Sequence, residues 1–492
     1  MKKQHILVAG SVLISALALQ SCETDIPQGV FYEAYTYAST DEDGGTWNPI
    51  LLTSGTDVLI DAPSDATSAE YLAELASTKT SASSISTEQQ EALDYWGNNT
   101  MVRWIEIAEE LTAKYFLPPD PGPEGNYPPP TAATATDPAS ADFPFAHPPF
   151  ASRMYAYFSA ATFDAMIAAW HYKYTYNRPA IFQTDGSVAQ AFPTNNIPSY
   201  PNEDAAIATV AEKILGFLFP NETAYLAEMA DECRESRKWA GLAVESDITA
   251  GDSIGSYVAN TFIARAKTDN SKFAAVDAAT YALLEDTADM MWGDQWDHWE
   301  NQDIPQRPVG ITPRFGNVIP WWIPDVETVR PGPPPAVGSA EFETATQELL
   351  DLTDNASKEQ EDIAYFWSDG PGTYSPPGHW NQIAIDHVVD GKLNPLRTAR
   401  VFAYMNTAMN DAGISCWDTK YYYFYPRPTN TNSDIDALFG VPNFPSYTSG
   451  HSTFSGAGAE VLGYFFPSAA GEFAAMAVEA SESRIYARIH FR

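Results

Sequence analysis

The stretch DAMIAAWHYKYTY, residues 164–176, decides the fold, because a similar stretch, DAGISCWDTKYYY, recurs at residues 411–423. An Asp, an Ala, an Ile, a Trp, a Lys and two Tyr are identical in the two stretches, always 247 residues apart. Three further pairs keep this offset: PSY at 198–200 and 445–447, LG and FP within 215–220 and 462–467, and ESR at 235–237 and 482–484. Four blocks in one register indicate two copies of one helical unit.

The rest of the chain is patterned like a helical protein. Runs rich in Ala, Leu, Met and Glu without strand alternation predict an all-α fold of two related helical bundles with Pro-rich loops. Before the bundles we expect an extended segment over 23–85, one helix over 88–115 and a Pro-rich loop over 118–149. The predicted organisation is a signal segment at 1–21, an N-terminal wrap, helix and Pro-rich loop at 22–149, a degenerate bundle at 150–290, a connecting segment at 291–338 and a catalytic bundle at 339–492.

Composition excludes several classes of protein. The chain has 492 residues, with 27 Lys and Arg against 64 Asp and Glu, and a net charge of −37. Such an acidic balance argues against nucleic acid as a partner, because phosphate backbones are bound by clustered Lys and Arg. Three cysteines exclude a disulfide framework, and whether Cys233 and Cys416 pair is left open.

The N-terminus reads as an export signal. Lys2 and Lys3 precede an apolar run over 6–19, which is followed by Cys22. A short basic segment, an apolar stretch too short for a confident membrane span and small residues are typical of a cleaved signal peptide. A cysteine at this place resembles the lipidation site of bacterial lipoproteins, with ordinary secretion as the alternative. We expect an exported protein, held at the cell envelope only by lipid on Cys22.

The two copies differ in their imidazoles. At the 247-residue offset, His451 corresponds to Asp204 and His490 to Ala243. The copies share their basic residues. The pair Arg178-Pro179 recurs as Arg427-Pro428, which is displaced by two residues from the common offset. Both histidines occur only in the C-terminal copy, which predicts that this copy holds the working site.

Three motifs of the C-terminal copy predict a site for a compact oxyanion. They are Lys420-x6-Arg427-Pro428, the stretch PSYTSGH at 445–451 and Ser483-Arg484-x5-His490. Forked Arg donors and a Lys point charge suit tetrahedral oxygens. Ser449 as a helix N-cap followed by Gly450 presents backbone N–H groups to an anion. The six-residue step from Arg484 to His490 requires the helix to end between them.

This combination resembles the superfamily of vanadium-dependent haloperoxidases and type 2 phosphatidic acid phosphatases, and in particular bacterial haloperoxidase homologues. The stretches IAYFWSDG at 363–370 and PPGHWN at 376–381 add to the resemblance. Carried over by motif, it implies that vanadate is bound by Lys420, Arg427, Arg484, Ser449 and Gly450, with His490 as the vanadium ligand and His451 as the acid–base group. It also implies that Asp369 orients Arg484 and that Trp417 and Phe444 shape the halide side.

The implied reaction is oxidation of a halide by hydrogen peroxide at the bound vanadate, with Lys420 as a polarising cation and an organic compound as the halogen acceptor. The competing function uses the same residues to hydrolyse a phosphomonoester, with His490 as the nucleophile and His451 protonating the leaving alcohol. A third reading is a non-catalytic surface lipoprotein with a relic site. A zinc hydrolase is a poor fit, because no His-Glu-x-x-His occurs and three cations would repel a divalent ion. The sequence stops two residues after His490, which suggests that the catalytic bundle is truncated.

Overall fold

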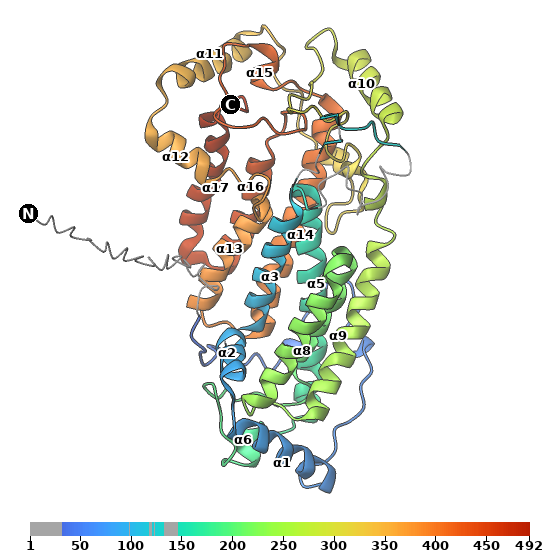
Figure 1. Cartoon of the computed structure of the whole chain (residues 1–492), viewed down its shortest axis with the longest axis vertical. Coiled ribbons are helices and arrows are strands. Elements are labelled where there is room, and N and C mark those ends of the chain that lie inside the picture. The colour runs from blue at the N-terminus through green and yellow to red at the C-terminus, as the bar shows by residue number, and fades with distance from the viewer. Residues whose placement is uncertain (1–31, 98, 118–120, 123, 132–145) are drawn as a thin grey trace, which may run out of the picture.

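The computed structural model describes residues 32–97, 99–117, 121–122, 124–131 and 146–492, and in these ranges the regular structure is helical (Figure 1). The expected signal segment and Cys22 lie outside the described residues. No helix of the described part is long and apolar enough to cross a membrane. The prediction of an all-α fold is confirmed.

Two long helices, α5 (Pro148–Tyr176) and α14 (Pro395–Tyr423), form the centre of the molecule and pack against each other. Each begins with a proline at its first position, where the missing N–H costs no hydrogen bond. Each ends at a residue in the left-handed conformation, Asn177 or Phe424, whose N–H bonds back to a Lys carbonyl. The two repeated stretches therefore occupy the C-terminal halves of the two central helices.

Further helices pack around the two central ones. Against α5 lie α7 (Glu203–Leu218) and α9 (Glu245–Ala266), and α8 (Thr223–Trp239) packs on α7. Against α14 lies α16 (Gly450–Phe465), α17 (Ala470–Tyr486) packs on α16, and α12 (Lys358–Phe366) packs on α17. Both central helices contact α3 (Thr100–Tyr115) and α13 (Ser375–Asp390). The bounds of α5, α7 and α8 are separated from those of α14, α16 and α17 by 247 residues, the offset of the sequence repeats.

Smaller helices complete the two ends of the molecule. At one end lie α1 (Ala69–Ser83), α2 (Thr87–Trp96) and α6 (Ile181–Thr184), and at the other α10 (Ala278–Trp292), α11 (Ala340–Asn355) and α15 (Pro428–Thr431) (Figure 1). Two expectations for the N-terminal part are wrong. The segment over 23–85 contains the helix α1, capped by Ser68, and the helix expected over 88–115 is broken after Trp96 into α2 and α3. Asn99 caps the new start, because its side chain accepts the N–H of Met101.

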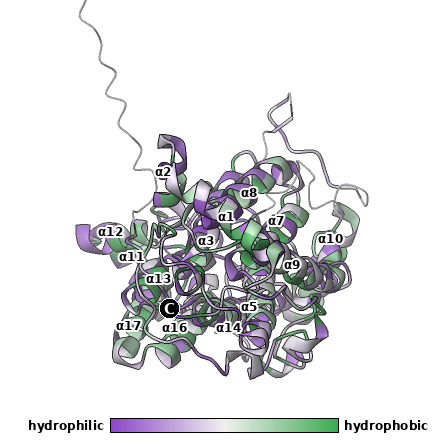
Figure 2. Cartoon of the chain, turned by 90° about the horizontal axis from the view of Figure 1, so that it is seen from below, coloured by the Kyte–Doolittle hydropathy of each residue, from purple (hydrophilic) through white to green (hydrophobic). Residues whose placement is uncertain are grey.

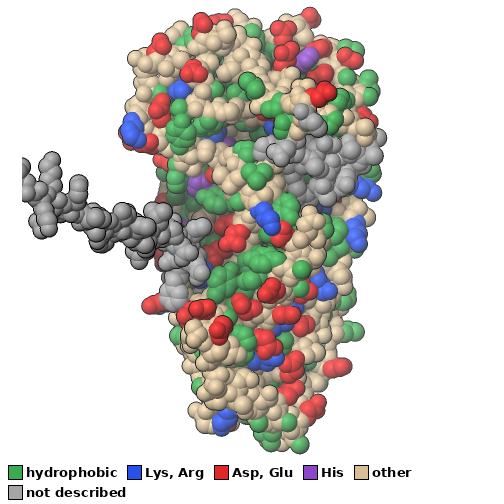
Figure 3. All heavy atoms as spheres, viewed as in Figure 1, with side chains coloured by type: hydrophobic (Ala, Val, Ile, Leu, Met, Phe, Trp, Pro, Cys, Tyr) green, Lys and Arg blue, Asp and Glu red, His purple; other side chains and the backbone are tan. Residues whose placement is uncertain are grey.

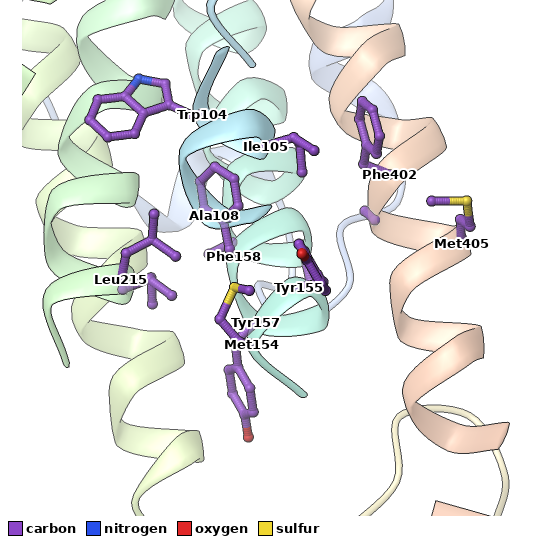
Figure 4. Packing of buried hydrophobic residues seen from close by; sticks show 14 of the residues in the cluster. Trp104, Ile105, Ala108, Met154, Tyr155, Tyr157, Phe158, Leu215, Phe402 and Met405 are labelled. Carbon is purple, nitrogen blue, oxygen red and sulfur yellow. The ribbon is translucent and has the colours of Figure 1, made fainter. Parts of the chain in front are cut away.

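The core extends through both bundles as one cluster of buried apolar side chains. Figure 4 shows Trp104 and Ile105 of α3, Tyr155 and Phe158 of α5 and Phe402 of α14 turned into the same region. Seen along the helices, hydrophobic faces turn toward neighbouring helices and hydrophilic faces outward (Figure 2). The acidic side chains are spread over the visible surface (Figure 3). Cys233 and Cys416 are both buried and free.

One buried carboxylate in each central helix fastens a loop to the bundle. Asp164 of α5 accepts the N–H groups of three successive residues, Ile50, Leu51 and Leu52, at 2.6, 2.9 and 2.9 Å. Asp411 of α14 does the same for the three residues at 321–323, at 2.7, 2.7 and 3.1 Å. Burial raises the pKa of Asp164 to about 6, although the three N–H groups act in the opposite direction. The first repeated Asp therefore has the same structural task in both bundles.

Candidate active site

The predicted site residues come together at the end of α14, where the chain reverses. Lys420 lies in the last turn of α14, and Arg427 follows it in an extended conformation. The N-terminus of α16 begins at Gly450, and Arg484 lies in the last turn of α17. Because α17 ends at Tyr486, the chain turns back and buries His490 beside them. We call Lys420, Arg427, His451, Arg484 and His490 the oxyanion cluster.

Lys420 is fully buried, and it is held by backbone carbonyls rather than by a carboxylate. Its Nζ donates to the carbonyl oxygens of Pro445 and Ser446 at 2.8 and 2.9 Å. An ammonium group has three donors, so one remains for a guest. Burial, together with the charge of Arg427, lowers the pKa of Lys420 to about 7. In the free site the ammonium form of Lys420 thus has no carboxylate partner, and a bound anion would favour that form.

Arg427 is also fully buried and spans the loop before α16 and the segment after α17. Its Nε and Nη2 donate to the carbonyl of Phe444 at 3.1 and 2.9 Å, and its Nη1 donates to the carbonyl of Ile489 at 3.0 Å. Burial lowers the pKa of Arg427 to about 9. These bonds fix the plane of the guanidinium group next to His490.

The orientation of His490 is fixed by two neighbours. Its Nε2 lies 3.1 Å from Nη1 of Arg427, and its Nδ1 lies 3.2 Å from Oγ of Ser446. A guanidinium group can only donate, so Nε2 carries the lone pair and Nδ1 carries the proton. Burial and the nearby cations, Arg427 first, hold the pKa of His490 well below its usual range. The imidazole is therefore neutral, with its lone pair directed into the cluster.

Arg484 approaches from α17 and has no direct partner among the carboxylates. Its Nε donates to Oγ of Ser483 at 2.9 Å, and its Nη2 donates to the carbonyl of Ala364 at 3.0 Å. Burial lowers the pKa of Arg484 to about 10. The expectation that Asp369 pairs with Arg484 is wrong, because no ion pair within 4.0 Å joins them. The charge of Asp369 acts on Arg484 only across a longer distance.

Asp369 instead lies between two imidazoles. It accepts from Nδ1 of His379 at 3.0 Å, and its Oδ2 lies 3.8 Å from Nε2 of His451. The ring of His379 stacks on Trp367 at a centroid distance of 4.4 Å, so packing fixes its orientation. His379 belongs to the PPGHWN stretch at 376–381, and the structure places it directly behind the carboxylate.

His451 lies in the first turn of α16 and lines a cavity. The carbonyl of Trp367 accepts a hydrogen bond from its imidazole, while its Nε2 has no hydrogen-bond partner among the described residues. Burial and the charge of Arg484 hold the pKa of His451 well below its usual range. A neutral imidazole with an unpartnered nitrogen beside a cavity is a suitable proton acceptor.

The helix start predicted at Ser449 and Gly450 is observed. Ser449 is the N-cap of α16, and its Oγ accepts the N–H of Ser452 at 3.3 Å. Gly450 lines the cavity, and a Cβ built there would come no closer than 3.9 Å to Phe454 or Trp417. Space therefore remains at the positive end of the helix dipole, where an anion is favoured.

A largely apolar cavity of about 500 Å³ opens beside the cluster. Trp417 and Phe444 line it, with their ring centroids 5.0 Å apart, and Trp417 is fixed by a bond from its Nε1 to the carbonyl of Ile311 at 3.1 Å. Four further apolar residues of its wall are Phe116, Ile304, Phe439 and Phe454. The cavity has room for an organic molecule next to the cations.

The charges of the cluster are not balanced within the part of the chain that the structure describes. Among the described residues, no carboxylate forms an ion pair within 4.0 Å with Lys420, Arg427 or Arg484, and the charge of Asp369 acts on Arg484 alone, from a longer distance. A buried charge without a partner raises the free energy of the folded state. Binding of an anion would therefore stabilise this group of cations. Sequence reasoning missed Ser446. It lies in the PSYTSGH motif at 445–451, but only Ser449, Gly450 and His451 of this motif were given a role.

Comparisons with known proteins find a match in the part of the chain that carries the oxyanion cluster. Residues 401–492 match the family model of the PAP2 superfamily. A vanadium chloroperoxidase of Curvularia inaequalis is 32% identical over 127 residues, which are 19% of this chain and 20% of the relative. The matched segment thus spans about a fifth of that curated relative.

Two solved structures match larger parts of the chain. The crystal structure of a bacterial vanadium-dependent iodoperoxidase has a TM-score of 0.54 and 24% sequence identity, and the match covers 70% of this chain and 86% of that one. A holo-type bacterial vanadium-dependent chloroperoxidase has a TM-score of 0.48 and 14% identity over 76% of this chain and 93% of that one. Residues 401–492, which carry the whole oxyanion cluster, are thus similar to the PAP2 superfamily, and the chain has a helical fold like that of the bacterial vanadium-dependent iodoperoxidase.

Proposed function

We propose that the chain is a vanadium-dependent haloperoxidase that oxidises halide with hydrogen peroxide. The observation that carries the proposal is the group of three buried cations without carboxylate partners, gathered around the lone pair of His490. An oxyanion such as vanadate supplies the missing negative charge. The relatives named above are vanadium-dependent haloperoxidases, and this supports the choice of vanadate.

The residues present fit vanadate. Lys420, Arg427 and Arg484 would hold its oxygens, together with Ser449 and the N–H of Gly450, and Nε2 of His490 would be the ligand of the metal. Ser446 keeps the proton of His490 on Nδ1, so the lone pair stays on Nε2, where vanadate would replace the hydrogen bond from Arg427. The chemistry that bound vanadate supplies is activation of hydrogen peroxide toward a halide, with no change in the oxidation state of the metal.

The other side chains handle protons and exclude water. Nε2 of His451 accepts a proton from the incoming peroxide, and the carboxylate of Asp369 stabilises the imidazolium that forms. Lys420 places its third N–H bond where negative charge develops. Trp417 and Phe444 give the halide an approach with little water, and the larger apolar cavity receives the organic acceptor.

Hydrolysis of a phosphomonoester is the second candidate, because the neutral His490 is equally suited to attack phosphorus. In that reaction His451 protonates the leaving alcohol. The same apolar cavity would then hold the alcohol part of the ester.

One experiment separates the two functions. The full chain is incubated with orthovanadate, hydrogen peroxide and bromide or iodide, and halogenation of an indicator is followed, while phosphate release is measured in parallel without vanadate. We expect vanadate-dependent halogenation that is lost in His490→Ala and His451→Ala. Phosphate release that vanadate inhibits, without halide oxidation, would reverse the ranking, and neither activity would leave a non-catalytic protein with a relic site.

Two further expectations belong to this proposal. We propose that the bundle at 339–492 is the catalytic unit and that at 150–290 its degenerate copy, which accords with the shared helix bounds. We also propose that the protein is exported and carries lipid on Cys22. Mass spectrometry of the chain from a bacterial envelope tests this, because lipidation would leave Cys22 as the first residue with its thiol acylated.

A further inference from the structure

We propose that the N-terminal bundle contains a second oxyanion cradle, whose place for the guest is taken by the chain's own carboxylates. We call it the twin cluster, defined by the cations Lys173, Arg178 and Arg237 and the carboxylates Glu203, Asp204 and Asp247. Its ligand class, a tetrahedral oxyanion, rests on the proposed function of the oxyanion cluster.

The lysines of the two clusters are held in the same way. Lys173, in the last turn of α5, donates from Nζ to the carbonyls of Pro198 and Ser199 at 2.6 and 3.5 Å. Lys420 donates to the carbonyls of Pro445 and Ser446, which lie 247 residues further on. The two ammonium groups therefore occupy equivalent positions in their bundles.

The arginines on α8 and α17 also correspond. Nε of Arg237 contacts Oγ of Ser236 at 3.1 Å, and its Nη2 donates to the carbonyl of Trp96 at 2.8 Å. Arg484 makes the matching bonds to Ser483 and Ala364. Each guanidinium group lies over a phenylalanine ring, at 5.3 Å in the twin cluster and at 5.4 Å in the oxyanion cluster.

Asp247 takes the place of His490 in space. Arg178 donates from Nη1 to Oδ1 of Asp247 at 2.9 Å, and Oγ of Ser199 lies 3.3 Å from the same oxygen. In the other bundle Arg427 and Ser446 make these two contacts with His490. The sequence offset pairs His490 with Ala243, so the true counterpart lies four residues later, at the start of α9. Asp247 brings a negative charge where the oxyanion cluster has a neutral ligand.

The other two carboxylates, Glu203 and Asp204, occupy positions that correspond to the oxyanion site and to the acid–base histidine of the C-terminal bundle. Glu203, the counterpart of Gly450, pairs with Nζ of Lys173 at 2.7 Å. Asp204, the counterpart of His451, lies 3.4 Å from Nη1 of Arg237 and accepts from Thr100 at 2.7 Å. Both side chains are nine-tenths buried. The oxygens that a guest would offer to Lys173 and Arg237 are thus supplied by the protein.

The charge balance explains why only one cluster is open. The twin cluster has three cations and three carboxylates, all with ion pairs. In the oxyanion cluster no described carboxylate pairs with a cation, and Asp369 acts only on Arg484, across a longer distance. The cavity at the twin cluster is about 70 Å³, against about 500 Å³ at the other, and Tyr35 and Tyr37 line it. The wild-type chain therefore binds one oxyanion, and removal of Glu203 and Asp204 uncovers a second site.

The test is the stoichiometry of orthophosphate binding to the full chain, measured by isothermal titration calorimetry. The variant Glu203→Gly/Asp204→Asn restores the glycine found at the other helix start and removes two charges. We expect one phosphate per wild-type chain and two per variant chain. The matched control is Glu212→Gln/Asp231→Asn, which removes two carboxylates that pair with Arg234 on the same bundle. It should still bind one phosphate.

Each outcome decides the proposal. An unchanged stoichiometry in the variant, a second phosphate on the wild type, or a second phosphate on the control would overturn it. Should the double variant fail to fold, Glu203→Gln keeps the shape of the side chain, and phosphate should then raise its Tm more than that of the wild type; an equal rise would overturn the proposal. If the wild type binds no phosphate, the proposed function fails separately, and the change from none to one in the variant still decides the twin cluster.

Discussion

Asp369 joins two imidazoles, with His379 at 3.0 Å from one carboxylate oxygen and His451 at 3.8 Å from the other. His379 donates to the carboxylate, so its ring holds Asp369 in place while the second oxygen faces His451. The unpartnered Nε2 of His451 can then take up a proton and find a carboxylate beside it. This arrangement assigns the proton transfer to His451 and its support to the pair behind it.

Removing the charge of Asp369 should slow catalysis. We expect Asp369→Asn to lower kcat for halide oxidation about 10²-fold, since the imidazolium of His451 loses its carboxylate. KM for the halide should change little. Steady-state kinetics checks this, with Asp386→Asn, an exposed residue of α13, as the control. A kcat equal to that of the control would show that Asp369 takes no part.

Binding of an oxyanion should draw a proton onto Lys420. Its pKa is about 7 in the free site, because the ammonium group is buried beside Arg427. A bound anion favours the charged form and raises this pKa, so at pH 8 binding takes up about one proton and weakens as the pH rises. Calorimetry of phosphate binding in buffers of different ionisation enthalpy measures the uptake. Lys420→Arg, which stays charged, should lose it, and equal uptake by both proteins would contradict the assignment.

We expect Ser446 to contribute to vanadate binding, whereas its counterpart Ser199 in the N-terminal bundle should not. Without its hydroxyl group, Nδ1 of His490 loses the partner that fixes the tautomer. We expect Ser446→Ala to weaken vanadate binding about 10- to 100-fold, as for other groups that orient a metal ligand. The vanadate concentration that gives half-maximal halogenation reports the change. Ser199→Ala is the matched control, and an equal effect of both variants would point to general destabilisation instead.

The loop fastened by Asp164 should give the stability of the chain a pH dependence. Burial raises the folded-state pKa to about 6, above the usual value, so the stability that this proton provides is present below pH 4 and is lost as the pH rises through 6. Compared with Asp164→Asn, the wild type should lose about 3 kcal/mol of unfolding free energy between pH 4 and pH 7. Denaturant unfolding at several pH values measures the difference. The exposed Glu91→Gln should keep a constant difference from the wild type, and so should Asp164→Asn if the carboxyl group does not titrate there.

The sequence predicted the fold well where the hydrophobic periodicity and the internal repeat both indicate the same helices. The blocks at an offset of 247 residues located the paired helices, and Ser449 marked the start of α16 because an N-cap acts locally. Prediction failed at the break after Trp96 and at α1, because short polar helices with weak periodicity are stabilised by caps and by contacts made elsewhere in the chain.

The site was predicted in its residues and only partly in its contacts. The structure brings Lys420, Arg427, His451, Arg484 and His490 together, as three motifs in this order and the family resemblance led us to expect. The expected pairing of Asp369 with Arg484 was wrong. Asp369 lies in a turn with a left-handed backbone conformation, and its carboxylate contacts His379 instead. A linear motif does not determine the direction of a side chain at such a turn. Ser446 and His379 act through other side chains, and a linear motif carries no information about which groups become neighbours.

The sequence by itself determined a helical, acidic chain with two related halves and both histidines in the second half, because hydrophobic period, composition and repeats are properties of the chain read in order. Only the tertiary structure decided which charges are balanced. Lys173 and Lys420 are equivalent in sequence, yet one meets Glu203 at 2.7 Å and the other only carbonyl groups. The difference arises because the free energy of a buried cation depends on which groups surround it in space, and segments far apart in the chain supply those groups.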